Sequence, residues 1–143
     1  MGLISPSDQE RLRHDFAQMT RPVRLLFFAQ TLGCETCPQA RQILDELPLL
    51  SDLITIEEVN FVLEPDKARQ YGVDRVPAIA VLYADGEDSR IRFLGTPAGY
   101  EFIALVQAVL LAGGRASSLS ERSREQLAAV ARPVTMQVFT TPT

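Results

Sequence analysis

The residue types best suited to chemistry in this sequence are two cysteines, Cys34 and Cys37, separated by Glu35 and Thr36. The spacing Cys-x-x-Cys serves structural zinc, an iron–sulfur cluster or thiol–disulfide exchange. A closed zinc site or a four-thiolate cluster needs four ligands, and the chain adds only His14, far away in sequence. We therefore predict dithiol exchange and no metal. Two inert cysteines, or zinc shared between two chains, are the alternatives.

The expected surroundings of the pair favour this chemistry. Cys34 follows an apolar strand and precedes a helix, whose free N–H groups and dipole stabilise a thiolate and lower its pKa. Cys37 lies one turn further on, close enough to displace a mixed disulfide. Glu35, Thr36 and Pro38 are the neighbours expected to modulate the pair. The charge of Glu35 opposes thiolate formation, so we predict a reducing to intermediate potential rather than a strong oxidant.

A second candidate feature is Val76-Pro77, at the start of an apolar run. Proline at the first position of a strand is compatible with a sheet edge. A cis Val76–Pro77 bond would instead present the Val76 backbone to a partner's extended chain. The residues alone leave both interpretations open. His14 and the pair Glu57-Glu58 are predicted to face solvent.

The apolar pattern predicts the elements that position these residues. Strands are expected at residues 23–29, 53–62, 77–83, 91–94 and 134–139. Helices are expected at residues 5–19, from Cys37-Pro38 onward, and at residues 64–71, 99–112 and 118–131. Ser7 and Glu10 fit a capping box in the first helix. Strands that alternate with helices and end in a hairpin favour an α/β sandwich with a mixed sheet.

Length and composition bound the function classes. The chain has 143 residues, of which 46% are hydrophobic and 22% charged, as in one ordinary domain with extra segments. A formal net charge of −4 argues against nucleic acid and anionic membranes as partners. The longest apolar stretch, residues 102–112, is too short to cross a bilayer. Residues 1–11 do not resemble a secretory signal, so a cytoplasmic protein is expected.

An internal repeat suggests how the chain is divided. Arg21-Pro22-Val23 recurs 111 positions later as Arg132-Pro133-Val134, and the same offset takes Phe28 to Phe139. We interpret this as a duplication, with chance as the alternative. The predicted division is a unit over 1–116, a connecting helix over 117–132, and the first strand of a second, truncated unit over 133–143. Such a strand has an open edge, and we expect disorder or self-association there.

Taken in order, these motifs resemble the thioredoxin/glutaredoxin superfamily. They resemble more closely the N-terminal unit of the tandem glutaredoxin-like protein disulfide oxidoreductases. The segments that carry the resemblance are Cys34-Glu35-Thr36-Cys37, Tyr71-Gly72-Val73, Val76-Pro77-Ala78, Tyr83, and residues 95–102 and 138–143. The resemblance implies a thioredoxin-like sandwich, with a four-stranded mixed sheet flanked by helices. An extra N-terminal helix and a C-terminal helix–strand extension would be added to it.

The resemblance also implies roles. Cys34 would be the nucleophile, Cys37 the resolving thiol, and Val76 with a cis Pro77 the substrate-binding shelf. The implied activity is a thiol–disulfide oxidoreductase of cell redox homeostasis, which acts on protein disulfides with electrons from a thioredoxin-reductase-like flavoprotein. Its redox-active disulfide would be its only cofactor. The alternatives are a dedicated electron-relay domain of a peroxide-reducing system and a non-catalytic binding module.

The sequence departs from these relatives at several positions. Phe28 stands where thioredoxins carry an aspartate as a proton relay, and Gly33 stands where they carry a tryptophan. Glu35-Thr36 replaces the Pro-Tyr of many glutaredoxins, which leaves glutathione use open. The second Cys-x-x-Cys of the tandem proteins is missing from this sequence.

Overall fold

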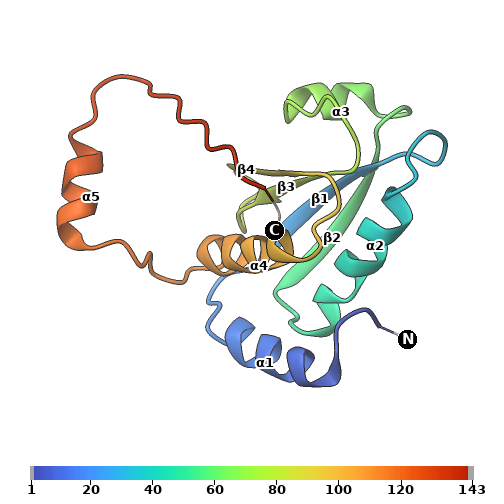
Figure 1. Ribbon diagram of the computed structural model, residues 1–143, viewed down its shortest axis with the longest axis horizontal. Coiled ribbons are helices and arrows are strands. Elements are labelled where there is room, and N and C mark those ends of the chain that lie inside the picture. Colours follow the sequence, from blue (N-terminus) through green and yellow to red (C-terminus); the bar gives the residue numbers. More distant parts are fainter. Residues whose placement is uncertain (1, 142–143) are drawn as a thin grey trace.

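The computed structural model describes residues 2–141, and its centre is one mixed sheet of four strands in the order β2-β1-β3-β4 (Figure 1). The strands are β1 (Val23–Ala29), β2 (Ile54–Asn60), β3 (Ala78–Leu82) and β4 (Asp88–Leu94). β1 runs parallel to β2 and antiparallel to β3, and β3 and β4 form the antiparallel hairpin. The predicted mixed sheet is confirmed.

Helices cover both faces of this sheet. The covering helices are α1 (Pro6–Phe16), α2 (Cys37–Asp45), α3 (Pro65–Gln70) and α4 (Tyr100–Ala112), with a short 3-10 helix, η1 (Leu47–Leu49), after α2. A further helix, α5 (Glu121–Ala128), does not cover the sheet. α1, α2 and α4 lie on one face and α3 on the other (Figure 1). β1 and β3 are therefore covered on both sides, which explains why both are almost continuously apolar.

Two hydrophobic clusters result from this layering. Because successive side chains of a strand point to opposite faces, Phe27 enters the larger cluster beneath α1, α2 and α4. Phe28 enters the smaller cluster on the α3 side, with Val59 and Ala80. The larger cluster includes Cys37, so the core reaches the predicted active site directly.

The start of α1 corrects one detail of the sequence analysis. The N-cap is Ser5, whose hydroxyl accepts a hydrogen bond from the Asp8 N–H at 3.2 Å. The predicted capping box of Ser7 and Glu10 is therefore wrong. Pro6 explains the difference, because its fixed φ and missing N–H suit the first helical position and move the cap to the residue before it.

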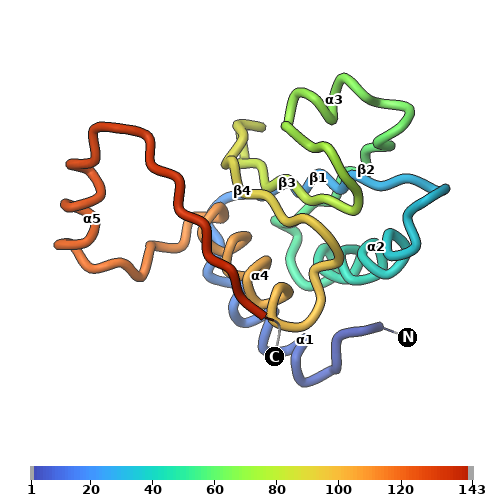
Figure 2. The backbone as a smooth tube through the Cα atoms, turned by 45° about the horizontal axis from the view of Figure 1, so that its top comes forward, coloured from blue at the N-terminus to red at the C-terminus, as the bar shows by residue number. Residues whose placement is uncertain are grey.

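α5 lies apart from the sheet, and the chain after it runs back toward α4 (Figures 1 and 2). Every residue of α5 is at least partly exposed, and Val138 and Phe139 beyond it are almost fully exposed. The predicted strand over residues 134–139 is not formed, because no backbone in residues 2–141 pairs with it. The last two residues of the predicted 133–143 segment lie outside the described part. The division into two units stays a prediction.

No helix within residues 2–141 has the length and apolar character to cross a membrane.

Candidate active site

The two cysteines lie just beyond the carboxyl end of the central strand β1, in the turn that leads into α2. Cys34 and Cys37 are joined by a disulfide, with their Cα atoms 5.5 Å apart. The approach to Cys34 is a tight turn, in which the Gln30 side-chain amide donates to the Leu32 carbonyl at 2.8 Å. Gly33 has φ +75°, a conformation that favours glycine. The backbone conformation thus explains a glycine directly before Cys34.

The two cysteines differ in exposure. Cys34 is half-buried against the larger cluster, whereas Cys37, the first residue of α2, is 5% exposed. The hydrogen-bonding of the helix begins at Thr36, whose carbonyl accepts from the Ala40 N–H at 3.0 Å. The pair therefore lies at the positive end of the helix dipole, where a thiolate is stabilised once the disulfide is reduced.

The neighbours of the pair are at the surface. Glu35, Thr36 and Pro38 are all exposed, with Pro38 in the first turn of α2. The Thr36 carbonyl also accepts a hydrogen bond from the Thr96 hydroxyl at 3.4 Å. Thr96 lies in the loop after β4 and was not among the predicted site residues. The sequence signal for Thr96 is its position in residues 95–102, one of the segments that carry the family resemblance.

The Val76-Pro77 segment lies next to the disulfide turn because of the strand register. Phe28, near the end of β1, is paired with Ala78 at the start of β3. The Val76–Pro77 bond is cis. Pro77 is buried and its carbonyl accepts from the Gly95 N–H at 2.8 Å, whereas neither backbone group of Val76 is paired within residues 2–141. Three loops, after β1, before β3 and after β4, thus meet around Cys34.

Beneath the disulfide end of the sheet, the side chains that pack together are apolar. Phe28 is fully buried and its ring lies 6.2 Å from that of Tyr71, measured between centroids. Arg92 donates to the Tyr71 carbonyl at 3.0 Å and forms an ion pair with Asp88. The hydrogen bond from Arg92 lowers the pKa of Asp88. In the described part of the chain, no polar or charged side chain is buried, so no acid lies under the disulfide there.

A cleft of about 240 Å³ opens beside the disulfide, between α2 and β2. Its lining includes Cys37, Arg41 and Glu58, and Glu58 forms an ion pair with Arg41. Glu57 binds Lys67 and Arg24 instead, and the hydrogen bond from Lys67 lowers its pKa. Both side chains face solvent as predicted, with Glu57 38% and Glu58 41% exposed. They have different partners, because neighbouring residues of a strand point to opposite faces.

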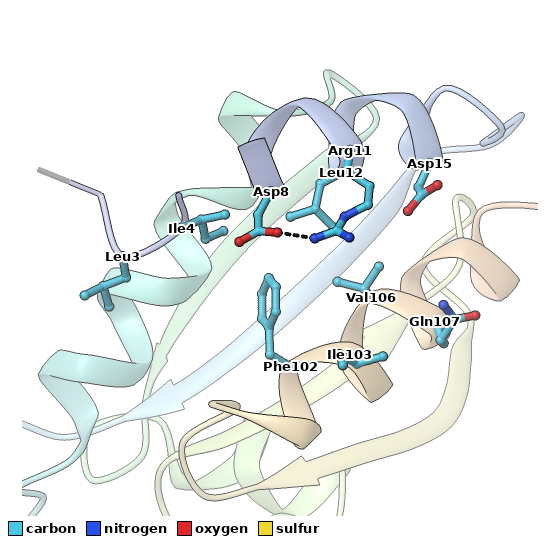
Figure 3. A pocket seen from close by; sticks show the side chains of 10 residues that line it. All are labelled: Leu3, Ile4, Asp8, Arg11, Leu12, Asp15, Phe102, Ile103, Val106 and Gln107. Atoms are coloured by element: carbon cyan, nitrogen blue, oxygen red, sulfur yellow. Dashed lines mark hydrogen bonds and ion pairs between the residues drawn. The ribbon is translucent and has the colours of Figure 1, made fainter. Parts of the chain in front are cut away.

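The groove shown in Figure 3 lies elsewhere, between α1 and α4. It measures about 460 Å³ and is lined by apolar side chains such as Leu12, Phe102 and Val106, with Asp8 and Arg11 at its rim (Figure 3). Neither cysteine lines it. His14 is exposed on α1. No group of three or more His, Cys, Asp or Glu in the described chain is placed to hold a metal ion.

Comparisons with known proteins agree with this geometry, although no family model matches the chain. A probable thioredoxin of Methanothermobacter thermautotrophicus is 31% identical over 74 residues, which make up 51% of this chain and 80% of that protein. The structure of the alkylhydroperoxide reductase AhpF from Enterococcus faecalis has 30% identity and a TM-score of 0.81, covering 88% of this chain and 60% of that one. A protein disulfide oxidoreductase structure from Aeropyrum pernix has 28% identity and a TM-score of 0.74, covering 87% and 54%.

Several of these relatives are longer than the region of similarity. The chain spans 14% and 18% of the length of two further curated relatives that it matches. The probable thioredoxin, by contrast, is matched over most of its length. With its mixed sheet, its disulfide at the start of α2 and this match, the chain belongs to the thioredoxin family of the thioredoxin/glutaredoxin superfamily.

Proposed function

We propose that this chain exchanges disulfides with protein substrates through Cys34 and Cys37. The observation that carries the proposal is the disulfide between them, at the start of α2 in a thioredoxin-family fold. The two cysteines are unequal, since Cys34 is half-buried and Cys37 is almost fully buried. A substrate disulfide therefore reaches Cys34 first, and Cys37 acts from inside the molecule.

The reaction follows from this asymmetry. In the reduced protein, the Cys34 thiolate attacks one sulfur of the substrate disulfide, whose other sulfur leaves and takes up a proton. A mixed disulfide now joins Cys34 to the substrate. The Cys37 thiolate then attacks the Cys34 sulfur and breaks the mixed disulfide. The substrate has gained two electrons as two thiols, and the Cys34–Cys37 disulfide has formed again.

Val76 and Pro77 are proposed as the shelf on which the substrate lies. The free N–H and carbonyl of Val76 next to the disulfide turn support this role, because an extended substrate backbone pairs with such groups. The exposed Glu35 is proposed to disfavour the thiolate and to keep the potential in the reducing to intermediate range. No cofactor besides the disulfide enters this proposal.

A second candidate function is a dedicated electron relay in a peroxide-reducing system. The similarity to the alkylhydroperoxide reductase AhpF over 88% of this chain favours it. On either proposal a thioredoxin-reductase-like flavoprotein supplies the electrons. A relay reduces one partner and leaves unrelated protein disulfides such as those of insulin intact, whereas a general oxidoreductase reduces them. A cytoplasmic location and self-association through residues 133–143 stay predictions.

The first experiment is a redox titration of the purified chain in defined dithiol buffers, read by thiol alkylation and intact mass. We expect one cooperative transition of both thiols at an intermediate or low potential. Cys34→Ser and Cys37→Ser are the controls and remove the cooperative transition. If both thiols of the unmodified chain are alkylated across the whole range, the oxidoreductase proposal is wrong. Peptide binding that survives in Cys34→Ser would then support a binding module.

A further inference from the structure

The resolving step needs Cys37 to release a proton, and its surroundings resist this. The side chain is 5% exposed and belongs to the larger hydrophobic cluster. Burial among apolar groups disfavours the charged thiolate. Since no polar or charged side chain is buried anywhere in residues 2–141, an acceptor for this proton has to reach Cys37 from the surface.

The cleft beside α2 offers such a group. Cys37 and Glu58 both line it, and Glu58 is the one acidic residue among the described residues of its lining. On β2, Glu58 follows Ile54 and Ile56 at every second position, and these two pack with the larger cluster. Its register partner Phe27 also faces that cluster. Glu58 thus places a carboxylate on the sheet face that α2 covers, where the strand pattern would continue with an apolar residue.

Arg41 holds this carboxylate at the cleft that Cys37 also lines. It follows Cys37 by four residues on α2, so the two side chains lie on the same face of the helix. Its guanidinium forms an ion pair with Glu58 and also lies 3.5 Å from the Asp45 carboxylate. Arg41 and Asp45 are therefore the charged groups that α2 places around Glu58. The charges on the other side of β2 are bound to Glu57.

We propose that Glu58 is the proton acceptor for Cys37 in the resolving step and that Arg41 positions it. This inference rests on the proposed function. The proton passes from the Cys37 sulfur to the Glu58 carboxylate, directly or through water in the cleft. The Cys37 thiolate attacks the Cys34 sulfur, the bond from Cys34 to the substrate breaks, and its electron pair leaves on the substrate sulfur, which takes a proton from solvent. Glu58 is partly exposed and returns its proton to solvent.

A stopped-flow reaction of the reduced chain with one equivalent of 5,5′-dithiobis(2-nitrobenzoate) separates the two steps. Attack by Cys34 releases the first coloured thiolate, and resolution by Cys37 releases the second. In Glu58→Gln we expect the second release to slow by roughly tenfold or more near neutral pH, with the first unchanged. The slowing should shrink at higher pH, because solvent then deprotonates Cys37. Glu57→Gln, the neighbour on the opposite face, should change neither release.

If Glu58 acted only through its charge, Glu58→Gln would have the opposite effect on the rate of the second release. Removing the negative charge of Glu58 lowers the pKa of the Cys37 thiol and would speed the second release. An unchanged or faster second release in Glu58→Gln, or a slowing that is equal at every pH, overturns the inference. Glu58→Asp, which keeps a carboxylate, should restore most of the rate, and Glu58→Ser replaces Glu58→Gln if that variant folds poorly. If the unmodified chain releases neither thiolate, the proposed function fails instead.

Discussion

Two segments of this chain have similar sequences and different structures. Residues 10–28 span most of α1 and β1, and residues 121–139 span α5 and the chain after it. They carry the same residue at eight of nineteen positions, namely Glu10 and Glu121, Arg11 and Arg122, Arg13 and Arg124, Ala17 and Ala128, Arg21 and Arg132, Pro22 and Pro133, Val23 and Val134, and Phe28 and Phe139. Both segments form the helix, and only the first forms the strand.

Burial shows why the two segments differ. Phe28 is 0% exposed between the sheet and α3, whereas its counterpart Phe139 is 90% exposed. A helix forms its hydrogen bonds within its own segment, so α5 needs no neighbour to exist. A strand forms them with another strand, and β1 has β2 on one side and β3 on the other. Similar sequences are therefore enough for both segments to form a helix, whereas the strand forms only where partner strands are present.

Hydrogen exchange should show the largest contrast between the two segments. We expect amides in the middle of β1 to exchange only on global unfolding, at a free energy of about 5–15 kcal/mol. Amides of residues 134–139 should exchange with almost no protection, because no strand in residues 2–141 pairs with them. Mass spectrometry with peptide resolution measures both. Slow exchange in residues 134–139 that grows with protein concentration would contradict this contrast and point to self-association.

Matched truncations of the two phenylalanines should give the next largest difference. Phe28→Ala removes a fully buried ring and should lower the free energy of unfolding by about 3–5 kcal/mol. Phe139→Ala should change it by less than about 0.5 kcal/mol, because that ring is exposed. Urea unfolding followed by circular dichroism measures both variants. A cost for Phe139→Ala close to that for Phe28→Ala would mean that the segment is packed in solution.

The two N-caps test the helices rather than the strands. Ser5 and Ser120 each accept a hydrogen bond from the N–H three residues on, at 3.2 and 3.1 Å. Ser5→Ala should lower the free energy of unfolding by about 1 kcal/mol, because α1 is packed on the core. Ser120→Ala should reduce the helicity of α5 and leave global unfolding unchanged. Equal shifts of the unfolding midpoint in the two variants would show that α5 docks on the rest of the protein.

Acid pH should give the smallest difference in stability between α1 and α5. The hydrogen bond from Ser5, and after it that from Arg11, lowers the pKa of Asp8. In α5 the third residue after the cap is Ser123, which carries no charge. A lowered pKa in the folded state stabilises α1 above the ordinary pKa of aspartate. This contribution disappears as the pH falls through the lowered pKa. An NMR titration should find Asp8 below the ordinary aspartate value, and Asp8→Asn should remove the dependence. A normal pKa for Asp8 would exclude this contribution.

The sequence was enough to predict that the cysteine pair lies between a strand and a helix, because the features that show this are local. The spacing of Cys34 and Cys37, the apolar run before them and the helical pattern after them lie within one short stretch. The same local reasoning placed the cap of α1 two residues late, at Ser7 instead of Ser5. Pro6 at the first helical position was the available signal, since proline favours that place.

Other residues of the site are far from the cysteines along the chain, so the sequence did not predict that they lie close to them. Thr96 contacts the disulfide turn only because β4 returns beside β3, and Glu58 reaches the cleft only because β2 pairs with β1. The alternation of side chains along β2 could have separated Glu57 from Glu58. It could not have shown that Cys37 lies on the same side as Glu58, since that depends on how α2 packs on the sheet.

By itself the sequence determined the helices, the turn with Gly33 and the position of the disulfide at a helix start. These features depend on hydrogen bonds and backbone angles within a few residues. Tertiary structure decided which apolar runs became strands, and which side chains share a cleft with Cys37. Residues 23–29 found partners on both sides, whereas residues 134–139 found none within residues 2–141. The physical reason is that strand hydrogen bonds and shared clefts join segments far apart in the chain, and only their packing brings them together.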